Sequence, residues 1–593
     1  RLYNKVPFLK KINSEYGEFS RGRMEAQSRR NSTTNNPGTS NKYREANLKL
    51  KKNAPLSLFH KLGTTNVMVR IIDEKGKVIN GKTNIINDNR IIFIPEADCE
   101  KAFAEVTGQK EQKAKIKFKL FDYTARLLMS LYNINISYTE NSGMGVYGYL
   151  PGSSLFGSSN YTTGNGTSLA PGIPFILGHQ DEHFGLDAAR NGWISKDTIL
   201  NRPYTMNKNT RLMLRAKVVP IPDLKIDIQA NRTYSSNSSE FFRYDDQKGW
   251  DSYNKSYNGN FSMSIISIGS SFEKLGNAEV KESGAWDQFQ KNREIIARSL
   301  DASRIQNIGD GYSPGTINPA TGYPVGYGPT SQEVLIPAFL AAYSGTSAEK
   351  VSLSPFPSAK FMMPNWRIQY SGAVNKIDGL KDIMKSMNIL HDYRSTYNVG
   401  SYITNMNYLP GNDGYSYKFD AQNNFIPHYD IASININETF NPLFDVDVTW
   451  INNFTTRLEY RKSRNILLSL ANNQATESYN NEASLGLGYR FDKMKMFIKT
   501  KNSQKTLNHD LNVRADFSYG KNKTILRKLI EENNQITAGQ QSVSVKFSAD
   551  YNLSEVFIVR LFYDRLLNSP FISNSYRTTT SNFGVSFRFT LIQ

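Results

Sequence analysis

The C-terminal segment shows the alternation of apolar and polar positions most clearly. Between residues 582 and 591, every second position holds a large apolar side chain, namely Phe583, Val585, Phe587, Phe589 and Leu591. The positions between them hold small or polar residues, including Arg588. Because a β-strand places successive side chains on opposite faces, this pattern predicts a strand with one apolar and one polar face.

A hairpin with the same alternation is predicted over residues 211–231, "RLMLRAKVVPIPDLKIDIQAN". One face of its two strands carries Leu212, Leu214, Ile226 and Ile228, and the other carries Arg211, Arg215, Lys217, Lys225 and Asp227. The turn between the strands is "PIPD", whose prolines cannot continue a β-ladder. Each strand has about nine or ten residues, the length at which a tilted strand crosses a bilayer.

The same alternation of apolar and polar residues recurs from residue 115 to residue 593, and we expect roughly 14 strands of this kind. Aromatic residues reach 12%, with 33 Tyr, 33 Phe and 5 Trp. Strand length, aromatic density and long polar loops such as residues 141–201 favour an all-β fold, a large antiparallel transmembrane β-barrel. The alternative is a soluble β-sandwich or solenoid in which the apolar face is a core.

Two segments of the barrel region have helical rather than strand spacing. Helices are expected near residues 285–302, where Trp286, Phe289 and Ile296 recur at helical intervals, and near residues 331–343. In the second helix Ser331 is a candidate N-cap and Pro337 is expected to kink the axis. Within a barrel such helices would pack inside the lumen or against a cap. The predicted strands do not alternate consistently in direction across residues 264–364, so a strand there is missed or wrongly assigned.

The N-terminal part of the chain has a different composition. Residues 1–60 are polar and basic, with the low-complexity stretch "RRNSTTNNPGTSNK", and are expected to be mobile. Residues 61–114 are expected to form a small β unit or loop, because "VMVRIID", "VINGKTNII" and "RIIFIP" read as strands separated by turns. The chain begins with Arg and has no signal peptide pattern, so we expect it to be part of a longer protein.

Composition and charge narrow the class of protein. The longest apolar stretch, "VLIPAFLAAY" at Val334–Tyr343, is too short for a membrane-spanning helix, which needs about 20 residues. The net charge is +19. The basic N-terminal segment lacks a nucleic-acid fold signature, so no nucleic-acid partner is predicted, and a solvated segment near an anionic membrane surface is favoured.

Catalytic and metal-binding signals are weak. Cys99 is the only cysteine, which excludes an intrachain disulfide or a cysteine metal cluster. The group "HQDEH", His179–His183, matches the inverted zincin pattern, but Gly178 and Gly185 flank it and no apolar helix face develops around it. We therefore predict a polar loop there. Phosphate-binding, dinucleotide and hydrolase motifs are absent, so we predict no catalytic residue, no metal and no cofactor, and a protein that is not an enzyme.

Several longer stretches resemble a known family. They are "YGPTSQEVLIPAFLAAYSG" (327–345), "MPNWRIQYSG" (363–372), "ETFNPLFDVDVTW" (438–450), "RLEYRKSRNILLSLANNQ" (457–474), "LGLGYRF" (485–491) and "SADYNLSEVFIVRLFYD" (548–564). Together they are similar to the C-terminal part of the SprA/Sov outer-membrane translocon of the Bacteroidota type IX secretion system. The similarity runs from about Lys61 to the end of the chain.

The resemblance implies a very large outer-membrane barrel that exports folded proteins from the periplasm to the cell surface through a lateral opening. Family members work with a PorV-type shuttle barrel, which collects cargo that carries a C-terminal signal domain, and with a Plug protein that seals the idle channel. A periplasmic ring and an inner-membrane motor supply energy. The surroundings would be outer-membrane lipid and lipopolysaccharide. This chain would form only a C-terminal portion of the wall, and residues 61–114 would lie in the periplasm.

A barrel assigns a role to each face of the predicted strands. The predicted lipid-facing residues are Phe583, Val585, Phe587, Phe589, Leu591, Leu212, Leu214, Ile226 and Ile228. The predicted lumen-facing residues are Arg211, Arg215, Lys217, Lys225, Asp227 and Arg588. A Lys or Arg on the lipid face would cost about 2–4 kcal/mol at the bilayer midplane. One departure from the usual barrel terminus is Gln593, which stands where a C-terminal aromatic is expected.

Two other functions fit the same pattern. A TonB-dependent importer would need a folded plug domain ahead of the barrel, and the basic segment before residue 66 does not resemble one. A secreted β-rich adhesin or binding module would bury the apolar face and remain soluble without detergent.

Overall fold

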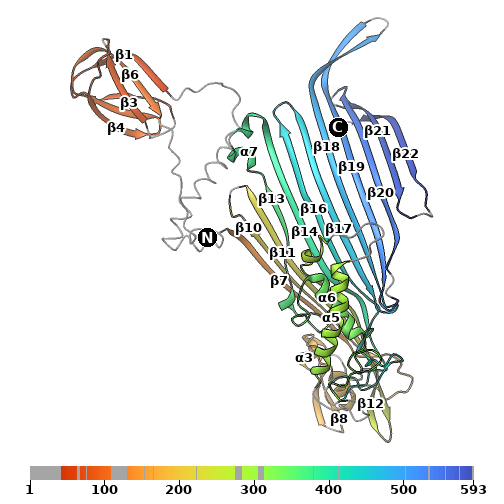
Figure 1. The fold of residues 1–593 in the computed structure, drawn as a ribbon. Coiled ribbons are helices and arrows are strands. Elements are labelled where there is room, and N and C mark those ends of the chain that lie inside the picture. The colour runs from red at the N-terminus through yellow and green to blue at the C-terminus, as the bar shows by residue number, and fades with distance from the viewer. Residues whose placement is uncertain are drawn as a thin grey trace. The chain divides into compact units, whose positions relative to one another are not determined.

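The computed structural model describes residues 42–62, 67–74, 76–108, 130–152, 154–164, 166–221, 223–273, 283–304, 313–377, 379–411, 414–500, 503–531, 534–554, 556–572 and 575–590 (Figure 1). Two compact units divide the chain, Arg1–Leu127 and Leu128–Gln593. Residues 1–41, 109–129 and 591–593 lie outside the described residues. These include most of the predicted basic segment, as well as Leu591 and Gln593.

The first unit contains two three-stranded antiparallel sheets. One has the order β1 (Lys42–Leu50), β6 (Cys99–Gly108), β3 (Val67–Asp73), and the other β2 (Leu56–Leu58), β5 (Arg90–Pro95), β4 (Gly81–Asn87). Alternate residues of β5 and β6, such as Ile91, Phe93, Ala104 and Val106, are buried in one shared core. The period-two pattern of these segments thus buries one face of each sheet against the other.

The start of this unit differs from the prediction. Residues 42–60 were assigned to a mobile polar segment, whereas β1 and β2 are strands of the unit. The register of β1 against β6 shifts on both sides of Leu48, and Asn47 has a φ of 59°. These irregularities interrupt the alternation of apolar and polar residues, so the strand gives no clear period-two signal in the sequence.

The second unit is built on one large antiparallel sheet of 14 strands. Twelve of them follow one another along the sheet in the order β22-β21-β20-β19-β18-β17-β16-β14-β12-β11-β10-β7. Their bounds are β7 Leu131–Gly145, β10 Tyr204–Val218, β11 Leu224–Asp245, β12 Gly249–Ser264, β14 Met384–Thr404, β16 Ser433–Trp450, β17 Phe454–Ser469, β18 Gln474–Thr500, β19 Ser503–Lys528, β20 Asn534–Asn552, β21 Phe557–Pro570 and β22 Thr578–Phe589. The two others are β13 Asn365–Tyr370 and β15 Tyr429–Ile431.

The predicted antiparallel all-β architecture is confirmed, and the sheet is open within the described residues. Strands β7 and β22 form its two edges, and each pairs with a single neighbour, β10 and β21 respectively. The other strands of the path have a partner on both sides. Both edges therefore carry backbone groups that have no ladder partner among the described residues.

One position in the sheet is shared by two strands, which explains the inconsistent alternation of strand direction near residues 264–364. β12 pairs with one half of β11 and β14, and β13 pairs with the other half of the same two strands. Both are antiparallel to β11, so they run in the same direction. The chain leaves the sheet after Ser264 and re-enters it at Asn365. A single strand position is thus split by an insertion, which a count of strands along the sequence cannot represent.

The insertion contains the two predicted helices, and both are confirmed. α5 spans Gly284–Ala302, and the Ser283 side chain accepts a hydrogen bond from the Trp286 backbone N–H, 3.3 Å. α6 spans Gln332–Ser344 and is buried from Val334 to Tyr343. Ser331 occupies the predicted N-cap position but makes no side-chain cap hydrogen bond, and Pro337 lies inside the helix.

Short elements complete the second unit. They are η2 Leu155–Gly157, β8 Ser159–Thr163, β9 Gly166–Ala170, α3 Ile173–Ile176, α4 Phe184–Arg190, η3 Ile268–Ser270, η4 Ala359–Phe361, α7 Ala373–Lys376 and η5 Leu380–Asp382. The segment between β7 and β10, which contains α4, has its own small core of Ala170, Ala188, Ala189, Trp193 and Ile194. No helix among the described residues is long and apolar enough to cross a membrane.

Candidate functional surfaces of the large sheet

Cross-strand pairing shows that the large sheet has two chemically different faces. Residues directly opposite each other in adjacent strands lie on the same face. Leu214 stands opposite both Ile136 and Ala230, and Ile228 stands opposite Trp366. Arg215 stands opposite Gln229, and neighbouring positions therefore carry polar groups on the other side. We call these two sides the apolar face and the polar face.

The apolar face continues to the C-terminal edge. Phe583 stands opposite Tyr563, which stands opposite Phe547, and Val585 stands opposite Leu561. Large side chains on this face are uncovered over most of the sheet, with exposed fractions between 36% and 70%. These residues form the apolar band: Tyr132, Ile134, Ile136, Tyr138, Phe444, Leu458, Leu485, Tyr489, Phe491, Phe517, Tyr519, Val543, Phe547, Leu561, Phe583, Val585, Phe587 and Phe589.

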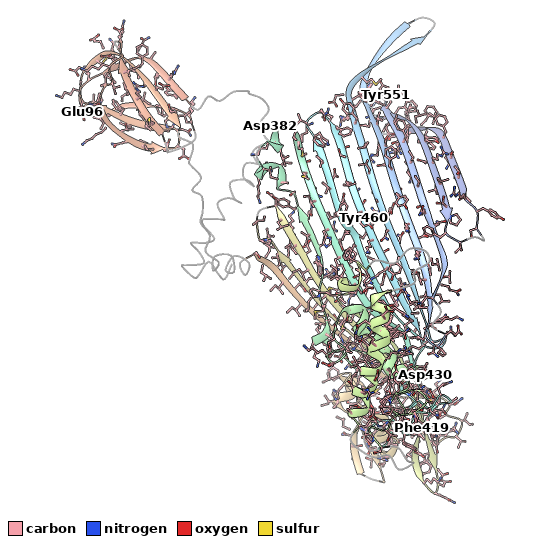
Figure 2. The ribbon with its side chains drawn as sticks, in the orientation of Figure 1. Glu96, Asp382, Phe419, Asp430, Tyr460 and Tyr551 are labelled. Atoms are coloured by element: carbon pink, nitrogen blue, oxygen red, sulfur yellow. The ribbon has the colours of Figure 1, made fainter. Side chains whose placement is uncertain are left out.

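The character of the apolar face changes along the strands. Figure 2 places Tyr551 toward one end of the strands and Asp430 at the other, with Tyr460 between them. Tyr460 and Tyr519 both pair with Ala483, so they stand at the same level of the ladder. Beyond them, toward the end where Asp430 lies, the next residues of this face are Lys462, Asn481 and Lys521, which are again cross-strand neighbours. The apolar band therefore ends at a row of polar side chains.

The polar face carries charged residues that are largely paired, either across strands or along one strand. Arg457 donates two hydrogen bonds to Asp445, at 3.1 and 2.9 Å, and Arg461 donates two to Glu459, at 2.7 and 3.0 Å. Arg560 holds Asp550 through two hydrogen bonds, at 2.5 and 2.8 Å. Arg490 pairs with Asp510.

Each described residue of the predicted hairpin and C-terminal strand falls on the expected side of the sheet. Leu212, Leu214, Ile226 and Ile228 share the apolar face with Phe583, Val585, Phe587 and Phe589. Arg211, Arg215, Lys217, Lys225, Asp227 and Arg588 fall on the polar face. The separation of the two groups is thus a property of the structure. Contact of one face with lipid and of the other with a lumen stays a prediction.

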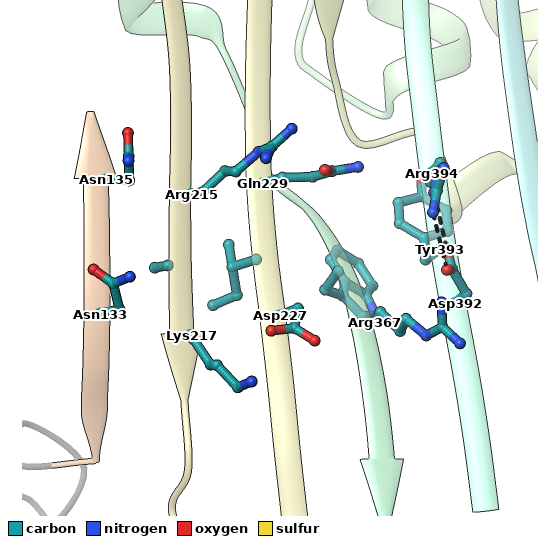
Figure 3. A pocket seen from close by; sticks show the side chains of 13 residues that line it. Asn133, Asn135, Arg215, Lys217, Asp227, Gln229, Arg367, Asp392, Tyr393 and Arg394 are labelled. Carbon is teal, nitrogen blue, oxygen red and sulfur yellow. Dashed lines mark hydrogen bonds and ion pairs between the residues drawn. The ribbon is translucent and has the colours of Figure 1, made fainter. Parts of the chain in front are cut away.

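A hollow of about 520 Å³ lies on the polar face between β7 and β14 (Figure 3). Arg215, Lys217 and Asp227, all singled out from the sequence, line it together with Arg367, Asp392 and Arg394. Arg394 donates hydrogen bonds to both carboxylate oxygens of Asp392, at 3.1 and 3.3 Å. The remaining lining groups include the amides of Asn133, Asn135 and Gln229.

The insertion that carries α5 and α6 covers the apolar face beyond the polar row. Both helices share one core with residues of the apolar face, namely Ile436, Ile466, Tyr397 and Phe261. The helices were expected inside the lumen or against a cap. They pack on the face predicted to contact lipid, and not on the face predicted to line a lumen. We call residues 265–364 the cap.

A buried ion pair fastens the cap to the sheet. Arg464 of β17 pairs with Glu438 of β16 at 2.5 Å, and both side chains are at most 2% exposed. Arg464 also donates hydrogen bonds to the carbonyl oxygens of Ser267 and Ser270, at 2.8 and 2.9 Å. Ser267 in turn donates to Glu438, 2.7 Å. These bonds compensate for the removal of both charges from water, which would otherwise be costly.

A second buried ion pair lies beneath the helices themselves. Arg527 of β19 and Glu477 of β18 are fully buried and 2.9 Å apart. The Tyr343 hydroxyl of α6 donates a hydrogen bond to Glu477, and Tyr479 donates another at 3.0 Å. Burial, together with the nearby Glu477 carboxylate, holds the pKa of Tyr343 well above its ordinary value, so this hydroxyl keeps its proton.

The first turn of α6 holds a half-buried carboxyl, that of Glu333. Burial raises the pKa of Glu333 to about 7, although the positive charge of Arg304 acts in the opposite direction. Arg304 is itself buried and lies over the Phe425 ring, 4.1 Å from its centroid. The cap therefore contains a carboxyl whose charge depends on pH near neutrality.

The histidine group forms no metal site with the described residues. His179 and His183 lie between α3 and α4, in a segment that is not helical, so the predicted polar loop is confirmed. Gln180 from this loop donates hydrogen bonds to the carbonyl oxygens of Gly143 and Asn207, at 3.0 and 2.6 Å. Among the described residues, no cluster of His, Cys, Asp or Glu could hold a metal ion.

Sequence reasoning missed Arg367, Asp392 and Arg394 of the hollow and both buried ion pairs. The residues of the hollow come from strands that precede and follow the cap in the sequence, and the partners of each ion pair meet only through the register of neighbouring strands. A partial signal existed, because "NWRIQYSG" alternates in the same way as β10 and places Arg367 between Trp366 and Ile368. No family model matches the chain, and no curated protein matches its sequence.

Proposed function

We propose that the large sheet is part of the wall of a transmembrane β-barrel in a bacterial outer membrane. The observation that carries this proposal is the apolar band, which is uncovered on β7 and from β16 to β22 while the opposite face is charged. A soluble sheet would bury such a face, since exposed apolar areas of this size favour association or contact with lipid. The fold alone does not fix a function, so this step depends on the surface.

The dimensions of the band support the proposal. In β19 the apolar positions run from Leu511 to Tyr519, about 26 Å along the strand at 3.3 Å per residue, which a tilt of about 40° reduces to a height of about 20 Å. Transmembrane barrels carry an apolar belt about 25 Å tall with aromatic residues at its borders. Tyr519 and Tyr460 stand at one border of the band, and Phe454 and Tyr489, which pair with each other, stand toward the other.

The connections between strands support an orientation. Short turns join β10 to β11, β16 to β17 and β20 to β21 at one end of the sheet. Longer segments, residues 146–203 and 405–428, leave the other end, and the cap covers the apolar face beyond the band on that side. Outer-membrane barrels have short periplasmic turns and longer extracellular loops. In the proposed barrel the cap therefore stands on the cell-surface side, outside the wall.

We further propose that this barrel is the protein-conducting translocon of a type IX secretion system, which exports folded cargo from the periplasm. The long stretches that resemble the SprA/Sov family support this, together with the two unpaired edges. Further strands would have to pair with β7 and β22 to close a barrel wide enough for a folded domain. The proposed partners are a PorV-type shuttle barrel, a Plug protein, signal-bearing cargo, and the periplasmic ring and motor.

Deletion of the gene tests the export function. We expect cargo with a C-terminal signal domain to accumulate in the periplasm of the deletion strain, while an outer-membrane porin assembles normally. A plasmid that carries the wild-type gene should restore export in the deletion strain. Normal secretion in the deletion strain would refute the translocon proposal. Export failure accompanied by loss of unrelated porins would also refute it, because it would indicate a general defect of the membrane.

Membrane fractionation separates the proposal from the adhesin alternative. The full-length protein should sediment with outer membranes and require detergent for extraction. A protein that remains in solution without detergent would refute the barrel. A TonB-dependent importer would instead contain a folded plug domain ahead of the barrel and would lose uptake, and not secretion, when deleted.

A further inference from the structure

The hollow on the polar face contains two ladders of cross-strand neighbours. One ladder crosses five adjacent strands, and its members are Asn133, Lys217, Asp227, Arg367 and Asp392. In the other, Asn135, Arg215 and Gln229 stand beside them. In Figure 3 these side chains lie on neighbouring strands, with Arg215 and Lys217 on one side of Asp227 and Arg367 on the other.

The cations of the hollow differ from other arginines on the polar face. Arg457, Arg490 and Arg560 are each held by a carboxylate. Arg215, Lys217 and Arg367 have no ion-pair partner among the residues that the structure describes, although Asp227 stands opposite two of them. Only Arg394 is paired, with Asp392. The hollow therefore presents three cations that remain available to a ligand.

We propose that this hollow binds an acidic peptide segment, whose carboxylates pair with Arg215, Lys217 and Arg367. Adjacent strands are about 4.8 Å apart, so Lys217 and Arg367, two strands apart, are separated by about 10 Å. A peptide in the polyproline II conformation has three residues per turn and rises about 3.1 Å per residue, so carboxylates three residues apart lie on the same side about 9 Å apart and match this spacing. The segment would run across the strands.

The polar groups between the cations favour a peptide over other anions. The Asp227 carboxylate can accept a hydrogen bond from a peptide N–H, and the amides of Asn133, Asn135 and Gln229 can bind peptide carbonyl or N–H groups. A nucleic acid strand would bring phosphates at regular intervals onto Asp227 and Asp392, and the like charges would repel. Arginine is also well suited to bind carboxylates through two hydrogen bonds.

The inference deepens the proposed function but does not depend on it. In the proposed translocon the hollow would lie on the inner side of the wall, where acidic segments of cargo could contact it. Peptide binding requires only the polar face, however, and not a closed barrel or export. Secretion assays test the translocon, whereas a binding assay on the purified protein tests the hollow, so the two can fail separately.

Fluorescence anisotropy of a labelled peptide tests the inference on the full-length protein in detergent. The probe has Glu at every third position in a Gly/Ser background, and its control has Gln at the same positions. We expect the Glu peptide to bind and the Gln peptide to bind at least about 10-fold more weakly, which corresponds to about 1.4 kcal/mol. Binding should weaken as salt is added, because the groups are exposed.

The double variant Arg215→Ser/Arg367→Ser locates the binding. It should bind the Glu peptide at least about 10-fold more weakly than the wild type. Arg490→Ser, on the same face but outside the hollow, should bind within about twofold of the wild type. Equal affinity of the double variant and the wild type would overturn the proposal. Tighter binding of a single-stranded oligonucleotide or of anionic vesicles than of the Glu peptide would overturn the assigned ligand class.

Discussion

The Met363 backbone N–H donates a hydrogen bond to the carbonyl oxygen of Ser264, 3.0 Å, so the cap begins and ends at one point of the sheet. At this point side-chain oxygens replace the backbone acceptors that a continuous strand would provide. The Asn231 N–H donates to the Ser264 hydroxyl, 3.0 Å, and the Ser395 N–H donates to the Asn365 side-chain oxygen, 2.8 Å. Both neighbouring strands thus keep partners for their backbone groups although the strand between them is interrupted.

Removal of the Asn365 side-chain acceptor should destabilise this junction. Asn365 is 4% exposed and Ser395 is fully buried, so Asn365→Ala leaves a buried N–H without its partner. We expect a loss of about 1–3 kcal/mol in the free energy of unfolding, measured by denaturant titration of the full chain. Asn141→Ala, an exposed position in β7, should change it by less than about 0.5 kcal/mol. Equal effects of both variants would contradict the role assigned to Asn365.

Loss of one partner of the buried ion pair should loosen the cap. Arg464→Leu leaves the Glu438 carboxylate buried and removes three hydrogen bonds to Ser267 and Ser270, in the segment that leads to α5. We expect destabilisation by about 3–5 kcal/mol and faster hydrogen exchange in α5 and α6. The double variant Glu438→Gln/Arg464→Leu should recover part of the loss, because no unpaired charge remains buried.

The exposed pair on the polar face provides the control for Arg464. Arg560→Leu removes a cation that is 52% exposed, and such surface pairs contribute about 1 kcal/mol or less. If Arg560→Leu and Arg464→Leu were equally costly, or if the helices kept their protection in Arg464→Leu, the cap would not depend on this ion pair.

The two faces of the sheet could be predicted from sequence because they depend only on residues close together in the chain. The alternation in β10 and β11 assigned Leu212, Arg215 and Ile226 to their sides of the sheet without knowledge of any neighbour. The hollow and the ion pairs depend instead on which strands are adjacent. Asp227 meets Arg367 only because β13 returns beside β11 after the cap, and the local sequence does not specify that return.

The face against which the two helices pack could not be predicted, for a related reason. The pattern of α6 shows that it is buried, since apolar residues surround the whole helix, but it does not show against which face. The charged residues Glu438, Arg464, Glu477 and Arg527 occur on the apolar face, and each interrupts the apolar alternation of its strand. Taken one at a time they resemble irregularities. Their common position under the helices is evident only in the three-dimensional structure.

The stability of α6 should depend on pH through Glu333. Its folded-state pKa of about 7 lies above the ordinary value of 4.5, so the folded state binds this proton more tightly. The contribution of Glu333 to the free energy of unfolding is therefore most favourable at low pH, and it is lost as the pH rises through about 7. We expect Glu333→Gln to be more stable than the wild type at pH 8, by up to about 2–3 kcal/mol, and similar to it near pH 4.5.

Hydrogen exchange in α6, corrected for the intrinsic effect of pH, checks this dependence. Protection should fall between pH 5 and pH 8 in the wild type and change less in Glu333→Gln. Glu294, on the exposed side of α5, provides the control, and Glu294→Gln should keep the wild-type dependence. A wild-type pH dependence in Glu333→Gln would show that another group is responsible.

Adjacent residues of β19 test the proposed contact with lipid. Phe517 lies on the apolar face and is 42% exposed, and Ser518 lies on the opposite face. In a bilayer, Phe517 would lie one row inside the border at Tyr519, so Phe517→Arg should cost about 1–2 kcal/mol, between the values for the midplane and the interface. It should reduce the amount of protein assembled in outer membranes, because the charge would face acyl chains. Ser518→Arg places the same charge one residue away, on the polar face, and should assemble nearly normally. Assembly is measured from the folded fraction in isolated membranes after urea extraction. Equal assembly of the two variants would show that the apolar face is not in contact with lipid.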